Sequence, residues 1–136
     1  MKLNTYLIFD GQCEAAFKHY AQALNGNLAM MMRFGEGPES AKLAEQDKNR
    51  IMHVRLEVGD QALMGSDTTA DYPFQGSKGF SVSVNVNSVA EAERVFSALE
   101  AGGSVTMPLS KTFWAERFGM LTDRFGVAWM VNCESA

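Results

Sequence analysis

Three side chains able to do chemistry alternate along one short segment, because His53, Arg55 and Glu57 lie two residues apart. Residues at this spacing on a β-strand point to the same face. Imidazole binds metals and exchanges protons near neutral pH, whereas a guanidinium pairs with a carboxylate. One interpretation is a polar patch lining a ligand site, and the other is a ladder facing solvent or a second subunit. We favour the ladder for Arg55 and Glu57, and both interpretations stay open for His53.

A second group of candidates lies near the C-terminus, in a stretch that contains both tryptophans. Trp114 and Trp129 offer flat surfaces on which an aromatic ligand can stack. Trp114 adjoins Glu116 and Arg117, and the arginine can anchor an anion through two hydrogen bonds. For Trp129 we favour plain core packing over ligand contact.

Methionines form a third group, because several of them fall on segments with strand-like patterns. Most are expected in the core. Those that line a pocket would give it an adaptable, polarisable wall for an apolar or aromatic ligand. The set consists of Met30, Met31, Met32, Met64, Met120 and Met130.

Nucleophilic catalysis has little support in the sequence. No Gly-x-Ser-x-Gly motif is present, and Cys13 falls on the apolar stripe of a predicted helix, where cysteine usually packs in the core. Cys133 lies close to the C-terminus. Two cysteines at these places do not predict a disulfide framework, so we expect a reducing, cytoplasmic location.

Composition narrows the classes of partner. The chain has 136 residues, 46% hydrophobic, with 21% charged residues and a net charge of −4. An acidic chain without a Lys/Arg cluster is not expected to bind nucleic acid or an anionic membrane. No apolar run approaches the length of a membrane span, and the N-terminal residues do not resemble a signal peptide. These features predict a single domain over residues 1–136.

The first half must supply the strand that carries His53. Short β-rich runs and one segment with apolar residues at helical spacing predict its elements. A polar segment over 36–49 predicts an exposed loop with a short helical turn. The expected strands are 5–9, 28–34, 51–58 and 61–65, and the expected helix is 12–25.

The second half repeats this order after a Gly/Pro/Ser-rich linker at about 68–78. Ser88 and Glu91 have the spacing of a helix capping box, and Gly102-Gly103 marks the end of that helix. Asp123 and Gly126 suit the first and last positions of a type I turn. The expected elements are a strand over 81–86, a helix from 89 to the glycine pair, a short strand over 104–107, a loop over 108–112, and a hairpin with strands 119–123 and 127–132.

Constant offsets connect the two halves. At an offset of 76, Ala16 corresponds to Ala92 and Tyr20 to Phe96, and at an offset of 66, Met64 corresponds to Met130. We therefore predict an internal repeat, with a first βαβββ module over 1–67 and a second over 79–134. Helices on one face of a sheet leave the other face to curve into a cup that can hold a small ligand.

Several stretches carry a family resemblance. They are residues 6–16 (YLIFDGQCEAA), 51–56 (IMHVRL) followed by Gly59-Asp60, 63–67 (LMGSD), and the segment 113–132. Together they resemble the PhnB-like branch of the vicinal oxygen chelate superfamily, which includes glyoxalase I, extradiol dioxygenases and bleomycin-resistance proteins. The resemblance implies an α+β fold of paired βαβββ modules forming a curved mixed sheet, and a homodimer. The branch is sometimes labelled as methyltransferase-like, but no glycine-rich nucleotide loop follows a predicted strand.

The resemblance also identifies where a metal would sit. Superfamily enzymes place two His, Gln or Glu ligands in each half, at the first and last strands. The matching residues here are poor ligands for a catalytic divalent cation, because lone hydroxyls bind weakly and thioethers prefer Cu(I). We therefore expect no metal and no other cofactor at these positions, which are Thr5, Met64, Ser81 and Met130.

Two functions from different classes follow. The first is a protein that binds a small, partly aromatic or apolar molecule in the cup without the usual metal site. The alternative is a metal-dependent lyase, isomerase or dioxygenase with a non-standard site near His53, Glu57 or Glu116. The expected partner is thus a small-molecule ligand. The candidate pocket residues are His53, Met64, Trp114, Glu116, Arg117, Trp129 and Met130.

Overall fold

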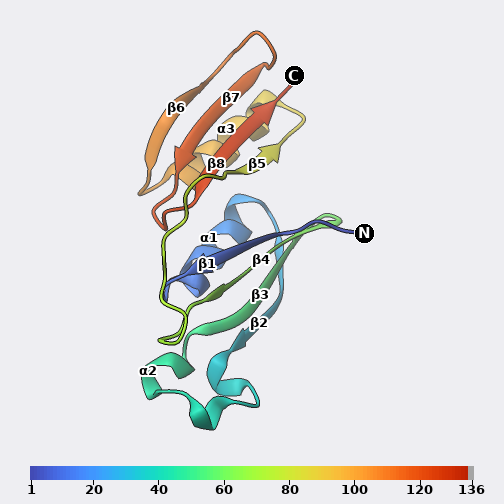
Figure 1. The fold of residues 1–136 in the computed structure, drawn as a ribbon. Coiled ribbons are helices and arrows are strands. Elements are labelled where there is room, and N and C mark those ends of the chain that lie inside the picture. The colour runs from blue at the N-terminus through green and yellow to red at the C-terminus, as the bar shows by residue number, and fades with distance from the viewer. Residues whose placement is uncertain (135–136) are drawn as a thin grey trace. The chain divides into compact units, whose positions relative to one another are not determined.

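The computed structural model describes residues 1–134 and divides into two compact units, Met1–Gly76 and a second that begins at Ser77. Each unit consists of a four-stranded sheet and one long helix (Figure 1). The order within both is strand, helix, strand, strand, strand, as the sequence predicts. Within the described residues, no helix is long and apolar enough to cross a bilayer.

The sheet of the first unit has the strand order β1-β4-β3-β2. Its first strand runs parallel to β4, and the remaining pairs are antiparallel. A parallel pair needs a crossover, and α1 begins that crossover. The elements are β1 (Thr5–Phe9), α1 (Cys13–Ala23), β2 (Asn27–Arg33), β3 (Ile51–Val58) and β4 (Gln61–Asp67).

Helix α1 covers one face of this sheet. The buried residues of α1 follow the predicted stripe, except that Leu24 caps the helix and Ala23 is the last buried position. Gly65 allows the close approach, because a Cβ atom there would lie 2.7 Å from both the Phe17 ring and the carbonyl oxygen of Leu7. The core between helix and sheet contains Leu7, Phe9, Cys13, Ala16, Phe17, Tyr20, Val54, Leu56 and Leu63.

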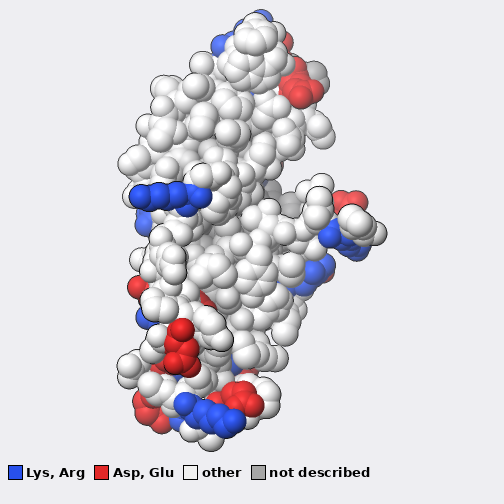
Figure 2. All heavy atoms as spheres, viewed as in Figure 1, with Lys and Arg blue, Asp and Glu red and all other residues white. Residues whose placement is uncertain are grey.

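The connection between β2 and β3 contains short helical segments, which confirms the predicted loop with a helical turn. They are the 3-10 turns η1 (Phe34–Glu36) and η2 (Ser40–Lys42) and the single-turn helix α2 (Glu45–Lys48). Acidic and basic groups alternate over this connection (Figure 2). Lys42 pairs with Glu39 at 3.0 Å and Lys48 with Glu45 at 2.8 Å, so these surface charges largely offset one another.

The sheet of the second unit has the strand order β5-β8-β7-β6, with β5 parallel to β8. Ser88 begins the helix, and its hydroxyl accepts a hydrogen bond from the backbone N–H of Glu91 at 3.1 Å, which confirms the predicted N-cap. The elements are β5 (Val82–Asn85), α3 (Val89–Glu100), β6 (Ser104–Ser110), β7 (Arg117–Thr122) and β8 (Ala128–Cys133).

The closing hairpin has the predicted turn. The N–H of Gly126 donates to the carbonyl oxygen of Asp123 at 3.0 Å, and the Asp123 carboxylate accepts from the N–H groups of Phe125 and Val127. Gly126 has a φ of +88°, a conformation that favours glycine. The turn therefore follows from local sequence chemistry.

The predicted end of β6 is wrong. The strand continues through Pro108 to Ser110, where the sequence indicates a loop. Strand β6 lies at the edge of its sheet and its pairing with β7 is irregular between Met107 and Ser110. An edge strand tolerates proline because the missing N–H faces away from the ladder. Strand β4 is also longer than expected and ends at Asp67.

Candidate functional site

The first sheet leaves the face opposite α1 without a covering helix of its own unit. Strand β1 shows the alternation, since Leu7 and Phe9 are buried towards α1 while Tyr6 and Ile8 are each 42% exposed. The strand register then assigns the neighbours, because paired residues share a face. We call this surface the first open face; it carries Tyr6, Ile8, Met30, Met32, His53, Arg55, Glu57, Met64 and Ser66.

Tyr6 and His53 form a stacked pair on the first open face. The ring centroids are 5.7 Å apart with an interplanar angle of 26°. The hydroxyl of Tyr6 lies 3.1 Å from Nδ1 of His53. When this hydroxyl donates, Nδ1 is the acceptor and the imidazole carries its proton on Nε2. The pair thus presents two flat rings with a fixed orientation.

Arg55 and Glu57 form an ion pair beside these rings. The Nε atom of Arg55 lies 3.0 Å from Oε2 of Glu57, and both side chains are more than a third exposed. Nη1 of Arg55 also lies 3.8 Å from the sulfur of Met64. The first open face therefore combines an aromatic pair, methionine sulfur and one neutralised charge pair.

The second sheet also has a face opposite its helix, and Met130 lies there. Met130 pairs with Ser83 on β5 and with Met120 on β7. Nδ2 of Asn132, on the same face, donates to Oδ1 of Asn85 at 3.1 Å. Oδ1 of Asn132 is buried and has no hydrogen-bond partner among residues 1–134. A buried acceptor without a partner is costly, so this position favours a donor from outside the unit.

Trp114 belongs to an exposed aromatic cluster at the start of β7. It contacts Phe113 at 4.8 Å and Phe118 at 5.3 Å, both measured between ring centroids with edge-on geometry. Trp114 is 47% exposed and Phe113 is 96% exposed. The cluster presents aromatic surface to solvent.

Glu116 and Arg117 are engaged elsewhere. The Glu116 carboxylate lies 3.9 Å from the ammonium of Lys111. Arg117 donates to the carbonyl oxygen of Glu116 and lies 3.9 Å from Glu93 of α3. The guanidinium of Arg117 thus lies towards the helix-covered face, on the other side from Met130.

Trp129 packs in the core of the second unit. It is 1% exposed, and its indole N–H donates to the Asp123 carboxylate at 2.8 Å. It shares the helix-covered face with Leu121, its partner on β7. The structure therefore does not bring Trp129 together with Met130 on one face.

The four positions implied for a metal differ in their placement. Thr5 pairs with Leu63 on the α1 side of the first sheet, whereas the residue paired with Met64 is Tyr6. Ser81 precedes β5, and Met130 lies on the uncovered side of the second sheet. Within residues 1–134, no three His, Cys, Asp or Glu side chains are grouped so that they could hold a metal ion.

Burial makes Cys13 a poor nucleophile. Removal from water raises the pKa of its thiol, and the carboxylates of Asp67 and Glu14 raise it further. A neutral thiol neither attacks electrophiles nor binds metals well. Cys13 and Cys133 are both buried, and no disulfide joins them.

Tyr6 is the residue that the sequence interpretation left out. In the segment 5–9 the side chains alternate, so that Leu7 and Phe9 point to one side of the strand and Tyr6 and Ile8 to the other. Both sides of the strand carry apolar residues, however, so alternation alone does not identify the uncovered side. The contact with α1 shows which side is covered.

Comparison with known proteins extends these observations. The sequence model of the 3-demethylubiquinone-9 3-methyltransferase family matches residues 1–132. Protein YjdN of Escherichia coli K12 is 34% identical over 97% of this chain and 95% of its own. The crystal structure of protein PA1353 from Pseudomonas aeruginosa is 57% identical, with a TM-score of 0.94 over 100% of this chain and 99% of that one.

More distant structures share the fold. A PhnB protein from Bacillus cereus, described as a putative 3-demethylubiquinone-9 3-methyltransferase, has a TM-score of 0.80 at 24% identity, covering 98% of this chain and 99% of that one. A glyoxalase/bleomycin resistance protein/dioxygenase family enzyme from Burkholderia phytofirmans has a TM-score of 0.66 at 11% identity, covering 96% of each chain. This chain therefore belongs to the 3-demethylubiquinone-9 3-methyltransferase family, a PhnB-like family with the fold of the glyoxalase, bleomycin resistance and dioxygenase proteins.

Proposed function

We propose that this protein binds a small, partly aromatic or apolar molecule on the first open face, without the metal site usual for the superfamily. The observation that carries the proposal is the Tyr6–His53 pair, whose stacked rings are joined by a 3.1 Å hydrogen bond beside Met64. Aromatic rings and methionine sulfur give dispersion contacts, and a nearby charge pair adds polar recognition. Pockets for small organic molecules commonly combine these features.

The binding interpretation does not include methyl transfer. The turn after β1 reads Asp10-Gly11-Gln12 and lacks the glycine-rich pattern that holds a nucleotide. The homodimer and the internal repeat belong to the same proposal, supported by the exposed apolar residues Tyr6, Ile8 and Met30 and by the shared strand order of the two sheets. Two buried thiols support a cytoplasmic location.

The ligand proposal is tested with 2-naphthol as an aromatic probe and methyl-¹³C methionine NMR. We expect saturable shifts of the Met30, Met32 and Met64 methyl signals. Tyr6→Ala should weaken binding about fivefold, because one stacking partner is lost. Tyr72→Ala is the matched control, since it removes a 76% exposed tyrosine outside the sheet. Equal affinities of the two variants, or shifts that do not saturate, would overturn the proposal.

The alternative is a metal-dependent enzyme that uses His53. One observation favours it, because Nε2 of His53 has no partner among residues 1–134 while Nδ1 is held by Tyr6. A histidine oriented in this way can bind a metal. Against it, Glu57 is paired with Arg55, and Glu116 lies near Lys111.

Elemental analysis of protein purified without chelators distinguishes the two functions. The binding proposal expects no stoichiometric Zn, Mn, Fe or Ni in the wild type or in His53→Ala. A stoichiometric metal that is lost in His53→Ala would establish the enzyme alternative instead. Tyr6→Phe serves as a control, because it removes the hydroxyl that orients the imidazole and keeps the ring.

A further inference from the structure

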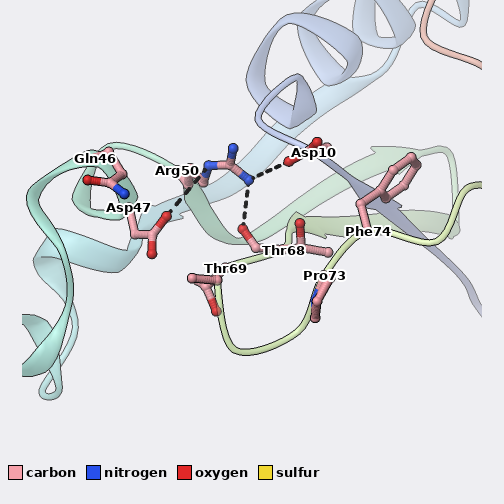
Figure 3. A pocket seen from close by; sticks show the side chains of 9 residues that line it. Asp10, Gln46, Asp47, Arg50, Thr68, Thr69, Pro73 and Phe74 are labelled. Atoms are coloured by element: carbon pink, nitrogen blue, oxygen red, sulfur yellow. Dashed lines mark hydrogen bonds and ion pairs between the residues drawn. The ribbon is translucent and has the colours of Figure 1, made fainter.

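The cavity drawn in Figure 3 lies in the first unit, between α2 and the chain that follows β4. Its charged groups are engaged with one another, because Nη1 of Arg50 lies 2.9 Å from Oδ1 of Asp10 and Nε of Arg50 lies 3.8 Å from Oδ1 of Asp47. The first open face differs from this cavity, since Nε2 of His53 has no hydrogen-bond partner among residues 1–134. That nitrogen is the polar group most available to a ligand of this face.

Nε2 of His53 is open to solvent, because it is not one of the buried side-chain atoms that lack a partner. The other ring nitrogen, Nδ1, lies 3.1 Å from the hydroxyl of Tyr6. The imidazole also stacks on the Tyr6 ring, with the centroids 5.7 Å apart, and this contact limits its rotation. A ligand on the first open face can therefore reach Nε2, and its own polar group must match the role of this atom.

The hydrogen bond with Tyr6 determines that role. Either the phenol donates to Nδ1, or the N–H of Nδ1 donates to the phenol oxygen. A phenol is a stronger acid than a neutral imidazole, and an imidazole nitrogen is a stronger base than a phenol oxygen. The O–H···N arrangement joins the better donor to the better acceptor, so the imidazole proton lies on Nε2. This atom is then a hydrogen-bond donor.

The neighbouring charges favour a neutral acceptor. Arg55, the next side chain on the same face, is also a donor, and its Nε lies 3.0 Å from Oε2 of Glu57. These two are the charged side chains of the first open face, so their pairing leaves it without net charge. An anion would have to draw the guanidinium away from Glu57, whereas a carbonyl oxygen needs only the N–H of His53.

Apolar groups surround this donor. Met32 is the cross-strand partner of His53 on β2, and Met64 is paired with both Tyr6 and Arg55. Thioether sulfur and the Tyr6 ring suit a flat aromatic skeleton. A ligand without an acceptor would cover the N–H of His53 and remove its water without replacing the hydrogen bond, which is costly.

We propose, on the basis of the binding function above, that the ligand is a neutral aromatic molecule with a carbonyl oxygen that accepts a hydrogen bond from Nε2–H of His53. His53 thus determines specificity. Tyr6 is a positioning residue, because its hydroxyl keeps the imidazole proton on Nε2. The same tautomer leaves no lone pair on Nε2 for a metal ion, since a ring nitrogen coordinates a metal only when it is unprotonated.

The tautomer is measured in the wild type by long-range ¹H–¹⁵N correlation of the imidazole rings at about pH 8, where unperturbed imidazole is neutral. We expect a protonated Nε2 and an unprotonated Nδ1 for His53. Tyr6→Phe keeps the ring and removes the donor, so the signals should move towards a mixture of tautomers, whereas Tyr72→Phe should leave them unchanged. A protonated Nδ1 in the wild type, or an unchanged spectrum in Tyr6→Phe, would overturn the proposal.

Ligand selectivity is measured with 1-indanone, which carries a carbonyl acceptor, and indole, a bicyclic molecule of similar size that carries an N–H donor. The methyl signals of Met32 and Met64 report binding in both titrations. Relative to His53→Phe, which keeps a flat ring without the N–H, the wild type should favour 1-indanone over indole about fivefold more strongly. An unchanged preference, or one that shifts towards indole, would overturn the proposal.

Two further probes separate this proposal from the binding function on which it rests. Saturable binding of 2-naphthol without the preference for 1-indanone would overturn the carbonyl class and leave the binding function standing. Absence of saturable 2-naphthol binding would overturn both. Benzoate should bind no more tightly than 1-indanone, because Arg55 stays with Glu57, and tenfold tighter binding of benzoate would overturn the neutral class.

Discussion

At the scale of single residues, Glu14 is a carboxylate whose pKa is shifted by two basic neighbours. Both of its oxygens contact Arg33, at 2.9 and 3.0 Å, and Lys18 lies 2.9 Å from one of them. Hydrogen bonds from Arg33 first, and then from Lys18, lower the pKa of Glu14 from 4.5 to about 2. The contact joins the first turn of α1 to the end of β2.

This pKa shift predicts a pH dependence. A lowered carboxylate pKa contributes stability that is fully present above pH 4.5 and is lost as the pH falls through about 2. Glu14→Gln should lower the free energy of unfolding at pH 7 by about 1 kcal/mol or less, because solvent screens the partly exposed pair. Urea denaturation at several pH values should show the difference from wild type shrinking below pH 4.5. Glu100→Gln is the control, and a difference that grew at low pH would contradict the assignment.

At the scale of elements, Asp67 ties three parts of the first unit together. From the end of β4, its Oδ1 accepts hydrogen bonds from the N–H groups of Gly11 and Cys13 at 2.8 and 3.0 Å. Its Oδ2 accepts from the N–H of Ile51 at 2.9 Å. The carboxylate thus joins the β1–α1 turn to the start of β3, next to the segment that carries Asp47 and Arg50.

Removing this carboxylate should destabilise the first unit. Asp67→Ala leaves three backbone donors without their partner, so we expect a loss of about 3 kcal/mol or more in the free energy of unfolding. Urea denaturation measures it, with Asp60→Ala in the exposed β3–β4 turn as the control. If the free energy of unfolding fell by less than about 1 kcal/mol in both variants, water would be replacing the lost acceptor. The three hydrogen bonds to Asp67 would then contribute little to stability.

The elements also differ in how well local sequence predicts them. Strands β1 and β3 have the predicted bounds, and α3 begins at its predicted cap. Their signals are local, in the form of alternation, a helical stripe and capping chemistry. The extension of β6 through Pro108 was missed because tolerance of proline depends on the edge position, which is a property of the whole sheet.

At the scale of the whole molecule, we expect a homodimer. The exposed apolar residues include Tyr6, Ile8 and Met30 on the first open face and Val105 and Met107 on the edge strand β6. Surfaces of this kind commonly mark association sites. Light scattering coupled to size exclusion should give twice the 14.9 kDa chain mass. A monomer at micromolar concentration would contradict this expectation.

The sequence by itself determined the order of elements, both helix stripes, the hairpin turn and the family resemblance. These features depend on interactions between residues close in the chain, and on motifs that can be recognised without a structure. His53, Arg55 and Glu57 were also correctly placed on one strand face, because side chains in a strand alternate.

Only the tertiary structure decided which side of each strand remains uncovered. Tyr6 rather than Thr5 is paired with Met64, and Trp129 lies under α3 instead of beside Met130. Asp47 lies in a charged, polar segment that gave no signal of burial, yet it is only 7% exposed. The physical reason is the same in each case, since burial and register are set by contacts between residues far apart in sequence.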